Sequence, residues 1–108
     1  AAAAKAGAWV IVDHVIGESR AWVQDLLNRL SGIPRALIKV DCREDILLER
    51  ERNRTDRTPD PAHAERQYGC IHQNFPHDFS IDTSEATPRE CAQKLMEQLP
   101  PEFRATQE

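Results

Sequence analysis

Three short apolar runs, each leading into an aspartate, constrain the fold of this chain more than any other feature. The first run is Trp9–Asp13, the second is Ala36–Val40 followed by Asp41, and the third contains Phe79 and Ile81 and ends at Asp82. The first run is continuous, which is typical of a strand buried on both faces of a parallel sheet, whereas Lys39 makes the second less purely apolar. Because helical patterns separate the runs, the sequence predicts an α/β fold with a parallel sheet of about three strands.

Local capping signals mark the helices between these strands. Ser19 is an N-cap candidate for an amphipathic helix, and a capping box with proline at the first helical position opens the closing helix. The Ala-rich start, ending at Gly7, is expected to be the last turns of a helix, which predicts that preceding sequence is missing. The expected helices begin near Ser19, Glu44, Asp60 and Thr87.

The length and the charge of the chain exclude several classes of protein. With 108 residues the chain fits one domain. A net charge of −4 argues against a general nucleic-acid binder, which carries a basic surplus, and no apolar run approaches the roughly 18 residues of a membrane helix. Three widely spaced cysteines, an odd number, fit reduced thiols and predict a cytoplasmic protein.

An arginine-rich stretch follows the second predicted strand, within Cys42–Arg57. Arg50, Arg54 and Arg57 are spaced i, i+4 and i+7, so a continuing helix would align them on one face. Three guanidinium groups match the oxygens of a polyphosphate. An exposed helix with salt bridges to Glu49, Glu51 and Asp56 explains the same pattern equally well.

Asp13 is the candidate metal ligand. In open α/β sheets ligands bind at the carboxyl ends of the strands, where an acid can hold Mg²⁺ directly or through a water. The alternative is that Asp13 only caps the following turn. Cys70, His72 and His77 match no zinc-binding pattern.

Four segments together resemble the chloramphenicol phosphotransferase-like family. They are Ala6-Gly7 before Val10–Asp13, Val40–Arg43 before Glu49–Arg57, Gln67-Tyr68 before His72, and Asp82-Thr83-Ser84 before Pro88–Ala92. The resemblance implies a three-layer P-loop kinase fold with a shikimate-kinase-like core, and transfer of the γ-phosphate of ATP to a small-molecule hydroxyl. Two positions depart from the family pattern: His14 stands where an acid is usual, and Thr55 where the lid often has glycine.

The resemblance also implies roles for individual residues. Asp13 would lie near magnesium, and Arg54 and Arg57 would be lid arginines that close over the phosphates. Arg50, Thr83 and Ser84 are the nucleotide-binding candidates, with Thr83 and Ser84 near the base. The cofactors implied are therefore ATP and Mg²⁺.

The sequence contains no G-x-x-x-x-G-K-[ST] motif, and its four glycines are scattered. The backbone cradle and the lysine that hold the β- and γ-phosphates are therefore not in this chain, and the resemblance places the catalytic base upstream of it. We expect residues 1–101 to be the carboxyl-terminal part of a P-loop kinase-like domain, with a lid around residues 50–60, and residues 102–108 to be a flexible tail. In that fold the P-loop strand lies between the first two strands predicted here, so this chain is either part of a longer one or pairs Val10–Val12 directly with Leu37–Val40.

Two readings of function remain open. In the first, the chain is the lid-bearing part of an ATP-dependent phosphotransferase and is inactive alone. In the second, it is a non-catalytic interaction domain derived from the same fold, which forms homo-oligomers through exposed sheet edges. A gluconate- or shikimate-type kinase differs from the first reading mainly in its acceptor, and no motif marks the acceptor pocket.

Overall fold

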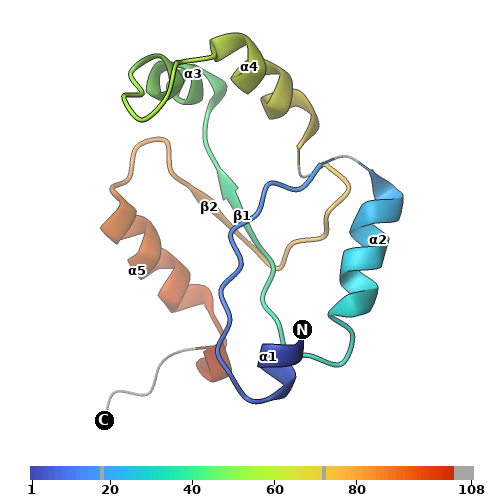
Figure 1. The fold of residues 1–108 in the computed structure, drawn as a ribbon. Helices are drawn as coiled ribbons and strands as arrows, with labels where there is room; N and C mark the ends of the chain where they lie inside the picture. The colour runs from blue at the N-terminus through green and yellow to red at the C-terminus, as the bar shows by residue number, and fades with distance from the viewer. Residues whose placement is uncertain (18, 72, 104–108) are drawn as a thin grey trace. The chain divides into compact units, whose positions relative to one another are not determined.

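The computed structural model describes residues 1–17, 19–71 and 73–103, and Figure 1 shows its elements in chain order. The described residues form two compact units. The N-terminal unit comprises Ala1–Arg35 and Cys70–Pro76, and the sheet unit comprises Ala36–Gly69 and the described residues from His77 onward. The elements are α1 (Ala2–Lys5), α2 (Arg20–Arg29), β1 (Ile38–Asp41), α3 (Glu44–Arg52), α4 (Pro61–Cys70), β2 (Phe79–Asp82), α5 (Pro88–Gln98) and the 3₁₀ turn η1 (Pro101–Phe103).

The sheet consists of β1 and β2, which pair in parallel, with Ile38 opposite Phe79 and Asp41 opposite Asp82. Two of the three predicted strands are thus confirmed. Asp78 holds the start of the pair: the Leu37 amide donates to its carboxylate at 2.8 Å, while the Asp78 amide donates to the Leu37 carbonyl at 2.7 Å. The parallel register places both strand-ending aspartates at the same edge of the sheet.

The strand expected at Trp9–Asp13 does not form, and neither does its direct pairing with Leu37–Val40. Trp9, Val10, Ile11 and Val12 have exposed fractions of 70%, 51%, 97% and 76%. The reason is that strand formation needs a neighbouring strand to complete the backbone ladder, so apolar composition alone cannot produce it. In the described part of the chain, this segment has no regular secondary structure.

We expect Ile11→Lys to leave the melting temperature of this chain almost unchanged. Because the Ile11 side chain is already exposed, the substitution removes no buried apolar area. Thermal unfolding followed by circular dichroism tests this, with Val23→Lys as the control, because Val23 is only 3% exposed. An equal loss of stability in both variants would contradict the structure.

The helix boundaries follow the predicted capping signals. The Ser19 hydroxyl accepts from the Trp22 amide at 3.3 Å, and Thr87 forms the full capping box with Glu90. Gly7 has φ of +95°, the left-handed conformation that suits the residue after a helix end. These short-range contacts depend only on neighbouring residues, which is why sequence alone located them.

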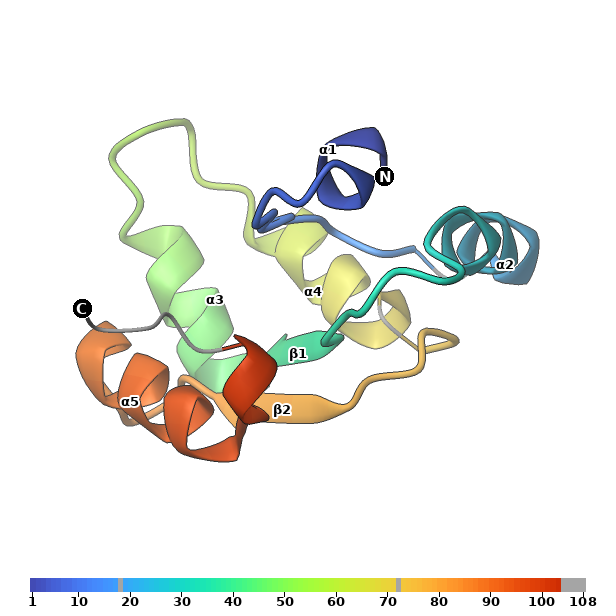
Figure 2. The same ribbon diagram turned by 90° about the horizontal axis from the view of Figure 1, so that it is seen from below.

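The core of each unit is small. Ile16 and Val23 are buried in the N-terminal unit, and Cys91 and Leu99 are buried in the sheet unit. Helix α5 packs against β2 (Figure 2), where the Cys91 thiol lies 3.8 Å from the Asp82 carbonyl oxygen. Of the predicted flexible tail, Glu102 and Phe103 belong to η1, and residues 104–108 lie outside the described residues. Among the described helices, none has the length and apolar character that crossing a membrane would need.

Candidate functional site

The loops that follow β1 and β2 are joined at the carboxyl edge of the sheet. The Thr83 amide and the Thr83 hydroxyl both donate to the Asp41 carbonyl oxygen, at 2.8 and 2.9 Å. The Ser84 hydroxyl donates to the Asp82 carboxylate and accepts from the Arg43 amide at 2.8 Å. The two hydroxyl-bearing residues therefore hold the strand ends together.

Arg50 reaches these loops from α3. Its guanidinium donates to the Thr83 hydroxyl at 3.1 Å and to the Thr83 carbonyl, and one of its nitrogens lies 3.5 Å from the Cys42 sulfur. The structure thus brings together the three nucleotide-binding candidates Arg50, Thr83 and Ser84. We call the full group the strand-end cluster; it consists of Cys42, Arg43, Arg50, Asp82, Thr83 and Ser84.

Charges in the strand-end cluster are balanced by nearby carboxylates. Hydrogen bonds from the Ser84 hydroxyl and amide lower the pKa of Asp82. Arg43 pairs with Glu85 at 2.9 Å and with Asp45 at 3.3 Å, and the hydrogen bond to Glu85 is the main reason that the pKa of Arg43 is raised. The edge of the sheet is therefore polar without being a simple basic patch.

The helix does not continue far enough to align the three arginines on one face. Helix α3 ends at Arg52 with Asn53 as its C-cap, so Arg54 and Arg57 lie beyond the helix and do not share a helical face with Arg50. Arg50 binds Thr83, whereas Arg54 and Arg57 bind acids of their own segment. Pro59 disfavours the α region only at Thr58, so it stops any later helix there but does not explain why α3 ends at Arg52. We call residues 51–60 the arginine segment.

Glu51 is the centre of the arginine segment. Its side chain is 8% exposed, and its carboxylate contacts Arg57 at 2.7 and 3.1 Å and Arg54 at 3.5 Å. It also accepts from the Asp60 amide at 3.1 Å, and this bond is the main cause that lowers the pKa of Glu51. One carboxylate thus connects the end of α3, the two arginines and the start of α4.

Arg54 has a second carboxylate partner. Its guanidinium makes two parallel hydrogen bonds to Asp56, of 2.9 and 2.8 Å. The hydrogen bond from Arg54 lowers the pKa of Asp56 to about 2, and the same bond raises the pKa of Arg54. The two arginines and the two acids Glu51 and Asp56 form a neutral group.

The salt-bridge interpretation is therefore confirmed for Glu51 and Asp56. Glu51 lies in the last turn of α3, but the arginines that pair with the two acids lie beyond the helix end. Glu49 is exposed and makes no ion pair within the part of the chain that the structure describes. Sequence reasoning named Glu51 only as one of three possible partners and did not anticipate its burial. The available signal was spacing, because Arg54 and Arg57 lie three and six residues after Glu51.

Asp13 lies in the N-terminal unit, in the exposed segment that follows Val12. Among residues 1–17, 19–71 and 73–103, no group of three His, Cys, Asp or Glu side chains is arranged to hold a metal ion. His72, part of the set considered for zinc, lies outside the described residues. Any Mg²⁺ held by Asp13 would need its remaining oxygen ligands from elsewhere, such as a nucleotide or water.

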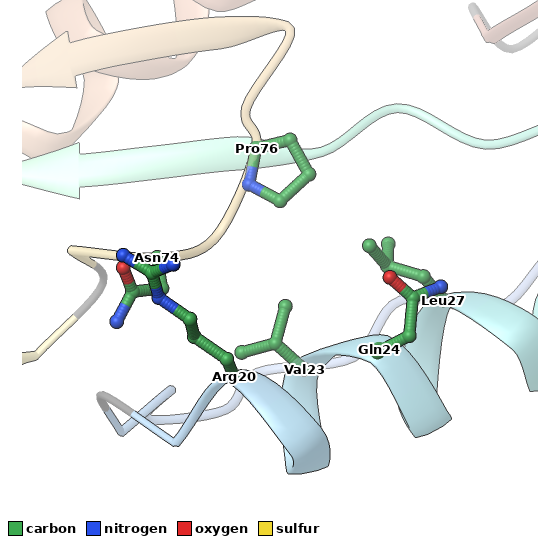
Figure 3. Close-up of a pocket in the computed structure, with 6 residues that line it drawn as sticks. All are labelled: Arg20, Val23, Gln24, Leu27, Asn74 and Pro76. Carbon is green, nitrogen blue, oxygen red and sulfur yellow. The ribbon is translucent and has the colours of Figure 1, made fainter.

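The N-terminal unit also contains an open hollow of about 380 Å³, which Figure 3 shows. Arg20, Val23 and Leu27 of α2 line one side, and Asn74 and Pro76 line the other. The lining combines apolar side chains with polar ones, which are Arg20, Gln24 and Asn74. None of these residues was a sequence-predicted site residue.

The fold and the site define an α/β protein with a parallel strand pair, a polar cluster at its carboxyl edge and an arginine-rich segment beside it. The chain belongs to the chloramphenicol phosphotransferase-like family, whose model matches residues 1–100. This membership is consistent with a P-loop kinase-like α/β fold. A search of curated proteins found no match. A search of solved structures found none either.

Proposed function

We propose that this chain is the lid-bearing part of an ATP-dependent enzyme that phosphorylates a hydroxyl group of a small molecule. The observation that carries the proposal is the family match over residues 1–100. The arginine segment supports it, because Arg54 and Arg57 are 40% and 46% exposed and so bring guanidinium groups to the surface of the sheet unit. A guanidinium fork matches the geometry of phosphate oxygens and keeps its charge at any physiological pH.

In this proposal the arginines supply charge and position. ATP provides the phosphoryl group. Arg54 offsets the negative charge that spreads over the phosphate oxygens, and Arg57 adds positive charge nearby from its place beside Glu51. Arg50, Thr83 and Ser84 form the nucleotide side of the site, with Arg50 fixing the loop that carries both hydroxyls. By the family resemblance, Asp13 of the N-terminal unit would supply a carboxylate oxygen for Mg²⁺, directly or through water, and such hard oxygen ligands suit this ion.

We assign no phosphate cradle to this chain, because its sequence lacks the P-loop motif. The β- and γ-phosphates therefore have no row of backbone amides to bind here, and the chain alone should not transfer phosphate. In the intact enzyme the arginine segment would close over phosphates held by a P-loop. The proposed setting is the cytoplasm, with a small-molecule hydroxyl acceptor.

A second candidate function is a non-catalytic interaction domain that forms homo-oligomers. The observation that favours it is the exposure of Trp9 and Ile11 in a segment without regular secondary structure, together with Val40 of β1 at 64% exposed. Unpaired strand edges and exposed apolar segments are templates for pairing with another chain. Under this candidate the arginine segment is purely structural.

A transfer assay separates the two candidates. We expect no transfer from γ-labelled ATP to a panel of hydroxyl compounds with the 108-residue chain, and transfer when the chain is expressed with the coding sequence that precedes Ala1. In that longer product, Arg54→Ala should lower kcat by at least about tenfold, since a transition-state arginine contributes far more than that in related chemistry. Arg29→Ala serves as a matched control, because Arg29 pairs only with the exposed Asp25 of its own helix in the described structure. A preceding sequence without a phosphate loop, together with a self-associating chain, would favour the interaction domain.

A further inference from the structure

We propose that the two arginines of the arginine segment have different tasks: Arg57 is a structural anchor, and Arg54 is the phosphate ligand that Asp56 holds until a polyphosphate displaces it. The inference rests on the proposed function only for the chemical class of the ligand. Its basis in the structure is the different exposure of the two acids that the arginines bind.

Arg57 is held by an acid that cannot easily release it. Glu51 is almost fully buried, and Arg57 makes two contacts to its carboxylate, of 2.7 and 3.1 Å. If Arg57 moved to a ligand, the Glu51 carboxylate would lose its closest cationic partner while remaining shielded from water. Removing one partner from a buried ion pair is far more costly than separating an exposed pair. Arg57 therefore stays in place.

Arg54 is held mainly by an acid that can release it at little cost. The Asp56 side chain is 65% exposed, so water can solvate its carboxylate once Arg54 leaves. The other contact of Arg54, to Glu51, is long at 3.5 Å, and Glu51 would still keep Arg57 and the Asp60 amide. A phosphate offers Arg54 the same bidentate geometry as Asp56 does, with greater charge.

The consequence is an exchange at one side chain. In the ligand-free state the Asp56 carboxylate accepts hydrogen bonds from Nε and one terminal nitrogen of Arg54 and cancels the charge of this guanidinium. A di- or triphosphate takes the place of the Asp56 carboxylate, and no covalent bond forms or breaks. Asp56 is thus a positioning residue that competes with the ligand and lowers its affinity.

The test is a titration of the 108-residue chain with inorganic tripolyphosphate at neutral pH, followed by NMR of the arginine side-chain Nε–H groups. We expect Asp56→Asn to raise the affinity by about two- to fivefold, the range expected for loss of one exposed competing ion pair. Only the Arg54 signal should shift strongly on binding, and the Arg57 signal should stay close to its starting position.

The matched control is Glu49→Gln, which removes the same charge from an exposed position without an arginine contact in the described chain. An equal gain in affinity from Glu49→Gln and Asp56→Asn would overturn the inference, because it would show a general charge effect. The inference would also be overturned if the Arg57 Nε–H signal shifted most, or if the Arg54 signal showed no saturable shift in the wild-type chain and in Asp56→Asn. This readout is binding of the anion, so it does not depend on phosphotransfer. If Arg54 exchanges Asp56 for the anion but no longer product transfers phosphate, the inference stands and the proposed function is wrong.

Discussion

Glu51→Gln should lower the melting temperature of the chain by several degrees, more than any other single substitution in the arginine segment. The Glu51 carboxylate contacts both Arg54 and Arg57 and accepts from the Asp60 amide. Glutamine keeps the size of the side chain and one acceptor oxygen but loses the charge that both guanidinium groups need. The start of α4 should loosen too, because the Asp60 amide loses a charged acceptor and Asp60 itself caps His63 at 3.1 Å.

Acid titration provides a second readout of the same substitution. The pKa values of Glu51 and Asp82 are lowered in the folded chain, and that of Asp56 falls from 3.8 to about 2. A lowered folded-state pKa gives stability that is fully present above the unfolded pKa and lost as the pH falls through the folded value. We therefore expect constant stability from neutral pH to about 5, a loss that begins near 4.5, and a shallower loss in Glu51→Gln.

Thermal unfolding at pH 7 and at pH 3, followed by circular dichroism, measures both effects. Glu49→Gln is the control, since the exposed Glu49 carboxylate lies on the same helix without an arginine partner among the described residues. Equal melting temperatures for the two variants at pH 7 would show that Glu51 does not organise the segment. A Glu51→Gln variant that lost as much stability on acidification as the wild type would contradict the assigned pKa direction.

Features that depend on neighbours in the sequence were the ones that could be predicted. Ser19 and Thr87 cap helices through residues three positions away, and the apolar runs near Ile38 and Phe79 form β1 and β2. The run at Trp9–Asp13 has an equally strong apolar pattern but does not become a strand. Whether a run pairs depends on which other strand is present, and no property of the run itself contains that information.

The candidate site also contains some features that the sequence could predict and others that it could not. The contact between Thr83 and Arg50 could be expected, because Thr83 follows one of the parallel strands and Arg50 lies on the helix that follows the other. The placement of Arg54 and Arg57 could not be expected. Helical spacing puts residues on one face only where the chain is helical, and α3 ends at Arg52. The burial of Glu51 depends on the path of the chain from Arg52 to Asp60, which local propensities do not specify.

The family match and the missing P-loop motif together led us to propose that this chain supplies Arg54 to a phosphate site whose cradle its sequence does not contain. A polyphosphate held only by Arg54, with Asp56 competing for the same guanidinium, has few of the contacts that tight binding needs. The affinity of the chain for Mg-ATP should accordingly be weak, with Kd on the order of 1 mM, equivalent to a binding free energy of about −4 kcal/mol.

Isothermal titration calorimetry of the 108-residue chain with Mg-ATP tests this claim most directly. We expect no saturable heat at micromolar nucleotide, and only weak, salt-sensitive binding at millimolar concentrations. Submicromolar affinity would contradict it, because the β- and γ-phosphates would then have a complete binding site within these residues.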